Sequence, residues 1–247
     1  MVPRQGRPGG NRRSRRPHTI PWHREHECRA KYLATGIDVR TATKVDSITR
    51  TDGSQGWTLR IGDRSMHADA VVLTAPVPQS LALLAAGDVV LAADDLAALK
   101  AIRYEPCLAV LAVLDGPSGL NEPGAADPAD GPIDWIADNQ QKGISASPAV
   151  TIHATADFSH QHWSSPDEVV IAELLAAAGL SAAASVAQVQ RWRYARPVVQ
   201  HRERHLLAQG LAGLVFAGDA FGGAKVEGAV LSGRSAATAL DPGAEKC

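Results

Sequence analysis

One glycine-rich stretch near the end of the 247-residue sequence has the residue types that could bind an electron-rich ligand. Gly218 and Asp219 follow the short apolar run 214–217, and Gly223 precedes a segment that favours a helix from Ala224 onward. A helix N-terminus that follows glycines presents free backbone N–H groups and a partial positive charge. The stretch therefore predicts a buried strand, a tight turn and a helix whose first turn accepts an electron-rich or anionic atom.

A second set of chemically useful side chains is aromatic or cationic. Trp192 and Tyr194 stand two residues apart in an alternating segment, so both would lie on one face of a strand. Such a pair either packs in the core or flanks a flat substrate. Lys142 lies in the polar turn 139–143, where it is either solvated or reaches a ligand.

The histidine spacing argues against a metal site. His201 and His205 are four residues apart, but the zinc metalloprotease motif needs Glu directly after the first His, and Arg202 stands there. The other set with a usable spacing lies in the N-terminal segment and consists of His23, His26 and Cys28. We predict that the protein has no metal site.

Composition narrows the class of protein. The net charge of −1 gives no general argument for nucleic-acid binding, and the hydrophobic fraction of 45% is that of a globular protein. The three scattered cysteines suggest neither a disulfide framework nor a metal cluster and fit a reducing, cytoplasmic location. No apolar run approaches the roughly 18 residues of a membrane span, so we expect no membrane partner.

The N-terminal 27 residues differ from the rest of the chain. Residues 1–16 contain six arginines and no acidic residue, with Gly and Pro but no helical or strand period. This pattern predicts a disordered basic extension over residues 1–27. An arm that contacts nucleic acid is the alternative, and a salt-sensitive complex would support it.

Hydrophobic periodicity predicts a mixed succession of strands and helices after this extension. The expected strands are 37–39, 45–48, 57–61, 68–74, 107–114, 133–136, 150–156, 186–194 and 214–217. The expected helices are 80–86, 92–101, 166–179 and the segment from Ala224 onward. Because residues 107–114 are nearly all apolar, we expect that strand to be buried on both faces. On the last helix, Ala229, Gly233, Ala236 and Leu240 form a narrow face that can pack closely.

The glycine-rich stretch, with the order of elements before it, resembles the FAD-dependent amine oxidase superfamily and more closely its renalase-like branch. The resemblance covers roughly Lys31 to Leu240. In that superfamily a Gly-Asp pair after a buried strand meets the ribityl chain of FAD, and the next helix points its N-terminus at the flavin N1/O2 edge. The segments 44–48 and 68–79 resemble the strand that contacts adenine and the proline-rich turn near the cofactor.

The resemblance implies a set of site residues. The cofactor-binding residues would be Val45, Pro76, Gly218, Asp219, Gly223, Val226, Glu227 and Gly228. Lys142 would approach flavin N5, while Trp192 and Tyr194 would enclose a flat or amine-bearing substrate.

The resemblance also implies an organisation in parts. The fold class would be α/β (α+β), with an incomplete FAD/NAD(P)-binding-like domain and a mixed or antiparallel-sheet substrate domain. The first domain would comprise residues 28–85 and 205–247, and the second residues 86–204. The sequence contains no G-x-G-x-x-G turn, the motif that holds the FAD pyrophosphate, so we expect an N-terminally truncated member of the family.

The implied function is an FAD-dependent oxidoreductase that takes a hydride from a small molecule, either an amine or NAD(P)H, and passes the electrons to O2. Loss of the dinucleotide-binding motif would cripple this activity. The alternative is a non-catalytic remnant or binding module that cannot hold FAD.

Overall fold

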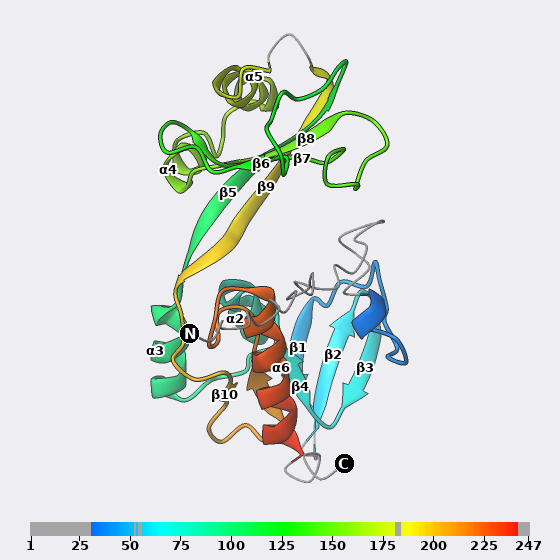
Figure 1. Cartoon of the computed structure of the whole chain (residues 1–247). Coiled ribbons are helices and arrows are strands. Elements are labelled where there is room, and N and C mark those ends of the chain that lie inside the picture. The colour runs from blue at the N-terminus through cyan, green and yellow to red at the C-terminus, as the bar shows by residue number, and fades with distance from the viewer. Residues whose placement is uncertain (1–30, 52, 54–55, 181–183, 242–247) are drawn as a thin grey trace, which may run out of the picture.

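The computed structural model describes residues 31–51, 53, 56–180 and 184–241. The basic extension and the set His23, His26 and Cys28 therefore lie outside the described residues. The described chain forms two bodies that are joined by the long strands β5 (Arg103–Leu114) and β9 (Ala184–Val199), as Figure 1 shows. We call them the lower body and the upper body, as they stand in that figure.

The lower body contains two small sheets. The strands β1 (Ser47–Arg50), β2 (Trp57–Ile61) and β3 (Arg64–Ala68) form an antiparallel meander. In the second sheet, β11 (Leu214–Phe216) lies between β10 (Leu206–Leu207) and β4 (Val71–Leu73), and it runs parallel to β4. The parallel pair matters for the site, because the carboxyl ends of β4 and β11 lie at the same edge.

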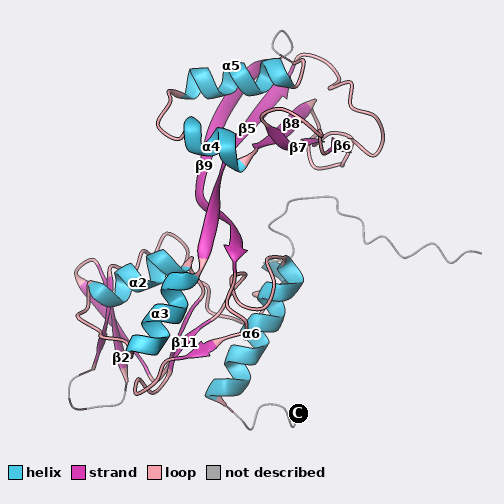
Figure 2. Ribbon diagram, turned by 90° about the vertical axis from the view of Figure 1, so that its left-hand side faces the viewer, coloured by secondary structure: helices cyan, strands magenta, loops and turns pink. Residues whose placement is uncertain are grey.

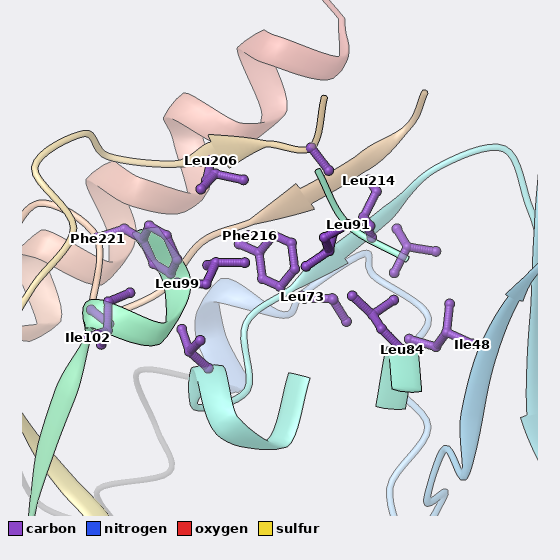
Figure 3. Close-up of a cluster of buried hydrophobic side chains, with 14 of the residues drawn as sticks. Ile48, Leu73, Leu84, Leu91, Leu99, Ile102, Leu206, Leu214, Phe216 and Phe221 are labelled. Atoms are coloured by element: carbon purple, nitrogen blue, oxygen red, sulfur yellow. The ribbon is translucent and has the colours of Figure 1, made fainter. Parts of the chain in front are cut away.

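Three helices surround these sheets. They are α2 (Val77–Ala85), α3 (Ala93–Ala101) and α6 (Val226–Leu240). Side chains from α2, α3, β4 and β11 meet in one hydrophobic cluster, which Figure 3 shows around Leu73, Leu84, Leu99 and Phe216. These four side chains are buried, so the core fixes α2 and α3 relative to the second sheet, while α6 packs on β11 through Ala236.

The upper body is one five-stranded sheet with helices on one side. Its order is β6-β7-β8-β5-β9, with β6 at Ala125–Ala126, β7 at Ile133–Asp138 and β8 at Ala149–Ala154. The helices α4 (Ala156–Gln161) and α5 (Asp167–Ala177) cover the face that holds its apolar core. The β5–β9 ladder continues from this sheet down to the lower body, with register shifts between Arg103 and Tyr104 and between Glu105 and Cys107. Figure 2 shows this ribbon between the bodies.

The succession of elements agrees with the expected α/β (α+β) class, but several local predictions are wrong. Residues 37–39 form no strand, because Ile37 and Val39 are exposed and have no ladder partner among the described residues. The segment 68–74 is divided between two sheets, since β3 pairs with β2 and β4 pairs with β11.

Two predictions about burial are also wrong. Leu111 and Val113 on β5 are 37% and 42% exposed, because helices cover only one face of the upper sheet. The buried face of α6 is formed by Gly228, Ser232 and Ala236, so Ala236 and the adjoining Leu240 pack as expected, whereas Gly233 is exposed. Composition indicates a small-residue face, whereas its phase depends on the tertiary contacts of the helix.

Candidate functional site

The turn after β11 holds its shape through glycine geometry and one buried hydroxyl. Gly218 has φ 127°, a conformation that side chains rarely adopt, and a Cβ there would lie 3.3 Å from the Thr74 carbonyl oxygen. Its N–H donates to Ser232 Oγ at 2.8 Å, and that hydroxyl donates to the Arg204 carbonyl at 2.5 Å. Ser232 is fully buried, so it links the turn, α6 and the segment before β10.

Asp219 follows directly and is partly buried. Burial raises the pKa of its carboxyl above the usual value, and the backbone N–H groups of Asp219 and Ala220 oppose this rise. The charge of Asp219 also raises the pKa of Tyr104, after the larger effect of burial, so the carboxylate and the phenol are close enough to interact.

At the start of α6 the backbone of Gly228 lies very close to the backbone of Gly223. Gly223 has φ 149°, and a Cβ on Gly228 would lie 2.2 Å from the Gly223 carbonyl oxygen. No side chain caps this N-terminus, so the N–H groups of the first turn keep their hydrogen-bonding capacity. Val226, in that turn, is 64% exposed, and the Glu227 side chain is exposed as well.

A second helix begins at the same edge. Pro76 is the N-cap of α2, again without a side-chain cap, and Val77 N–H donates to the Tyr104 hydroxyl at 3.1 Å. Ala217 N–H donates to the Leu73 carbonyl at 3.0 Å, so the ends of β4 and β11 are side by side. Two helix N-termini thus lie at the carboxyl edge of a parallel strand pair, the usual place for ligands in α/β sheets.

A cavity of about 530 Å³ lies beside the start of α6. Ala224 lines it from below, and residues of β5, β7, β8 and β9 line it from the upper body. Trp192, which is 55% exposed, and Tyr194 both contribute to its wall. The size is typical of small-molecule sites.

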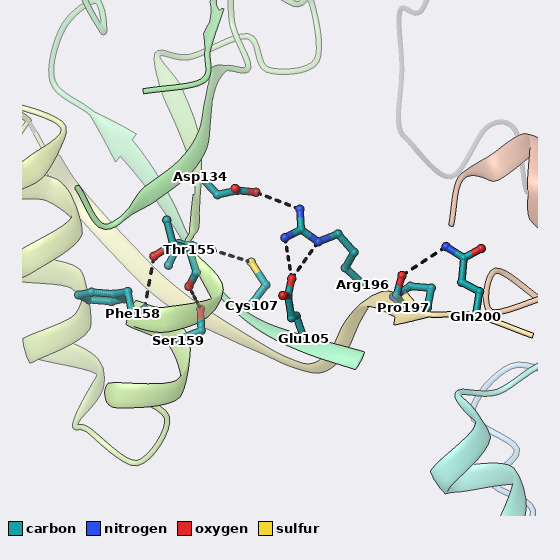
Figure 4. Close-up of polar contacts among 10 residues, drawn as sticks. Glu105, Cys107, Asp134, Thr155, Phe158, Ser159, Arg196, Pro197 and Gln200 are labelled. Carbon is teal, nitrogen blue, oxygen red and sulfur yellow. Dashed lines mark hydrogen bonds and ion pairs between the residues drawn. The ribbon is translucent and has the colours of Figure 1, made fainter. Parts of the chain in front are cut away.

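Three charged residues form a network in this wall, as Figure 4 shows. Arg196 Nη2 lies 2.6 Å from Glu105 Oε2, and Arg196 Nη1 lies 3.9 Å from Asp134 Oδ2. The hydrogen bond with Glu105 raises the pKa of Arg196 above its usual value. The charged lining therefore consists of two carboxylates and one guanidinium, an excess of negative charge.

Two further groups in the wall are neutral at pH 7. Burial raises the pKa of the Cys107 thiol to about 11. Burial lowers the pKa of His153, the charge of Asp134 opposes that shift, and Lys142 adds to it. Both groups can offer shape and hydrogen bonds to a ligand, but no charge.

Two of the expected site residues lie elsewhere. Lys142 Nζ is 4.6 Å from the centroid of the Trp135 ring, and Lys142 is not among the described residues that line the cavity. Val45 precedes β1, the first strand of the antiparallel β1–β2–β3 sheet, and packs against the hydrophobic cluster of the lower body. Pro76, Gly218, Asp219, Gly223, Val226, Glu227 and Gly228 lie at or next to the shared strand edge.

Sequence reasoning missed the network of Glu105, Asp134 and Arg196. Glu105 faces Arg196 across the β5–β9 ladder, beside a register shift, so their meeting depends on a bulge that no spacing predicts. Across the described part of the chain no cluster of metal-ligating side chains is found. No helix there is both long and apolar enough to cross a membrane.

The chain is similar in sequence and in fold to known proteins. The sequence profile of the flavin containing amine oxidoreductases matches residues 27–241. A putrescine oxidase solved with putrescine superimposes with a TM-score of 0.60 at 18% identity, over 85% of this chain and 51% of that one.

Two further solved structures have the same fold. An oxidoreductase from Methanosarcina mazei gives a TM-score of 0.56 at 16% identity, over 78% of this chain and 48% of that one. A candidate protoporphyrinogen oxidase from Exiguobacterium sp. 255-15 gives 0.56 at 19% identity, over 81% of this chain and 46% of that one. At these identities the likeness concerns the fold, and it confirms the predicted fold class. The chain spans about half the length of these structures.

Proposed function

The chain belongs to the flavin containing amine oxidoreductases, and on that premise we propose that it is an FAD-dependent oxidoreductase that acts on a small amine with O2 as acceptor. The observation that supports this most directly is the position of the 530 Å³ cavity, between the start of α6 and the aromatic and charged wall of β5 and β9. The renalase-like branch, with reduced nicotinamide as the other hydride donor, is the finer assignment that we propose.

The residues at the strand edge fit the ribityl and flavin part of FAD. Gly218 and Gly223 both have positive φ, and a Cβ at Gly228 would clash with the Gly223 carbonyl oxygen, so the glycines let the turn and the start of α6 pack backbone against backbone. The uncapped first turn of α6 offers N–H groups and a partial positive charge to an electron-rich flavin edge. We assign the cofactor part to residues 28–85 and 205–247 and the substrate part to residues 86–204, of which α3 packs in the lower core.

Bound FAD supplies the hydride acceptor, which no side chain can provide. In this proposal Asp219 accepts hydrogen bonds from the ribityl hydroxyls, and its raised pKa reflects a partly desolvated position that such bonds would satisfy. Gly223 and the first turn of α6 hold the flavin edge. Trp192 and Tyr194 exclude water from one side of the substrate.

The charge of the cavity favours a cationic substrate. Glu105 and Asp134 share one guanidinium, so one negative charge is left without a partner among the lining residues. An ammonium group near Asp134 would complete the pairing, because the Arg196 guanidinium approaches this carboxylate only at 3.9 Å.

The test is the visible spectrum of the purified chain after addition of FAD and removal of excess. We expect flavin bands at about 375 and 450 nm that bleach when a substrate amine is added in the absence of oxygen. Absence of flavin bands would contradict FAD binding. If no amine bleaches the bands but NADH or NADPH does, the result would support reduced nicotinamide as the hydride donor instead.

A second candidate is a binding module that does not retain FAD. It rests on one sequence observation, the lack of a G-x-G-x-x-G turn for the pyrophosphate. If this candidate is correct, equilibrium dialysis should show that the chain binds FAD and riboflavin, which lacks the pyrophosphate and adenosine, equally weakly.

A further inference from the structure

A second cavity, on the other side of the β5–β9 ribbon, has a different character. It measures about 510 Å³ and is lined by α2, α3, α4, the start of β5 and the middle of β9. Figure 2 shows α2 and α3 on one side of the ribbon and α6 on the other. Among the described residues, the two cavities have Pro106 and Tyr194 in common.

The ionisable groups of this second cavity are all bases, apart from the phenols. Its lining includes Lys100, Arg103, His160 and Arg193, and no Asp or Glu is among the lining residues of the described chain. Cations that gather without carboxylates repel one another and raise the local concentration of anions. This composition is the reverse of the first cavity, in which carboxylates are in excess.

Arg193 differs from the neighbouring arginines of its strand. Arg191 lies 2.5 Å from Asp167, and Arg196 lies 2.6 Å from Glu105. Within the described residues Arg193 has no carboxylate partner and instead stacks on Trp163, with its guanidinium carbon 4.6 Å from the ring centroid. Stacking holds the guanidinium in place and leaves its N–H groups available in the plane.

Arg103 and Lys100 complete the basic side at the end of α3. Arg103 Nη1 donates to the carbonyls of Lys100 and Ile102 at the end of α3. The position of this arginine is therefore explained in part by its stabilisation of the helix C-terminus. Arg193 and His160 belong to other elements, β9 and α4, so stabilisation of the α3 end does not explain why they lie here. The four bases therefore converge from separate parts of the chain.

Aromatic rings form the rest of the wall. Tyr104 and Tyr194 pack edge to face, with centroids 5.5 Å apart and an interplanar angle of 70°, and Trp163 lies beside Arg193. Half-buried rings next to fixed cations provide a surface for a planar ring that bears a negative group.

We propose that this cavity, which we call the basic cavity, is a binding site for a small planar organic anion, a ring that carries a phosphate or a carboxylate. The anionic group contacts Arg193 and Lys100, and the ring packs against Trp163 and Tyr194. The site lies on the other side of the ribbon from the amine cavity and shares Tyr194 with it, but binding of the anion does not require the proposed oxidase activity.

Calorimetric titration of the full chain tests this, with FAD present and with FAD absent. The probes are 1-naphthyl phosphate and 1-naphthoate, with neutral 1-naphthalenemethanol as the match in ring and size. We expect at least one anion to bind at least tenfold more tightly than the neutral probe, with an affinity that falls as NaCl is raised. The tighter of the two anions identifies the anionic group.

The variants R193Q and K100Q each remove one charge from the basic cavity, and both side chains are exposed, so the fold should be kept. We expect each to weaken the anion about tenfold. R60Q, on the exposed side of β2, is the matched control and should leave the affinity unchanged. Equal affinity for the anionic and neutral probes, or equal weakening by R60Q, would overturn the proposal.

Discussion

The carbonyl oxygen of Gly223 lies 2.2 Å from the point where a β-carbon on Gly228 would stand. The two glycines thus permit a contact that no other residue at position 228 allows without a backbone shift. This contact sets the direction in which α6 leaves the turn, and with it the direction of the first-turn N–H groups.

The substitution G228A should destabilise the protein and weaken FAD together. Overpacking of a tight site typically costs about 1–3 kcal/mol, and the displaced helix start should lower FAD affinity by about tenfold or more. G233A is the matched control, because a Cβ there meets nothing within 4 Å on the same helix. It should stabilise the helix by up to about 1 kcal/mol. Urea unfolding and FAD titration measure both effects, and equal behaviour of the two variants would contradict the role of the contact.

The Ser232 hydroxyl is the next point at which the turn can be tested. S232A removes the acceptor of Gly218 N–H and the donor to the Arg204 carbonyl, so two partly buried hydrogen bonds of the backbone are lost. We expect a loss of about 1–3 kcal/mol in the free energy of unfolding. S235A, which removes one partly buried hydrogen bond to His205, should cost less. If the two variants lose equal stability in urea, Ser232 does not have this linking role.

Asp138 gives a prediction about acid stability. The residue is only 3% exposed, and its carboxylate accepts hydrogen bonds from Ser118 Oγ, the N–H groups of Gln140 and Gln141, and the Gln141 side-chain amide. Burial alone would raise the pKa of Asp138, but these hydrogen bonds outweigh it and hold the pKa below its usual value.

Because the folded pKa is lowered, the ionised carboxylate stabilises the fold above about pH 4, and this contribution is lost as the pH falls through the folded pKa. D138N should therefore be less stable than the parent at pH 7, by about 1–3 kcal/mol, and the difference should shrink at pH 2–3. Urea unfolding at both pH values measures it. A difference that stays constant with pH would mean that the charge is not what stabilises this turn.

Cys107 should be unreactive at ordinary pH. With the pKa of its thiol raised to about 11, only about one part in a thousand is thiolate at pH 8. In the background C28S/C247S, alkylation by iodoacetamide should be slow at pH 8 and should rise about tenfold per pH unit up to about pH 10. A fast reaction at pH 7 would show that the thiol is not buried in the wall as described.

The carboxylate excess of the first cavity predicts a dependence on substrate charge. D134N should weaken the binding of benzylamine by about tenfold and leave that of neutral benzyl alcohol unchanged, because only the cation uses the carboxylate. Calorimetric titration of the FAD-loaded chain compares the two. D157N, on the exposed first turn of α4, is the control.

The sequence was most informative where local chemistry determines the structure. The apolar run before Gly218, the glycines after it and the helix beyond were predicted at nearly the observed positions, because each follows from residue type alone. The helix that begins after Pro166 and ends before Gly179 was predicted in the same way.

Long-range contacts account for most of what was missed. The phase of α6 depends on Ser232 meeting Gly218, and the charged network depends on a bulge that places Glu105 opposite Arg196. The basic cavity gathers Lys100, His160 and Arg193 from three elements, and no spacing in the sequence brings them together.

The two-stranded ribbon links these observations. Its register shifts beside Tyr104 and Glu105 lie between the two cavities, at the level of the residues that they share. Bulges are the places where a ladder bends most readily. The bulged stretch that carries Pro106 therefore shapes the walls of both cavities at once.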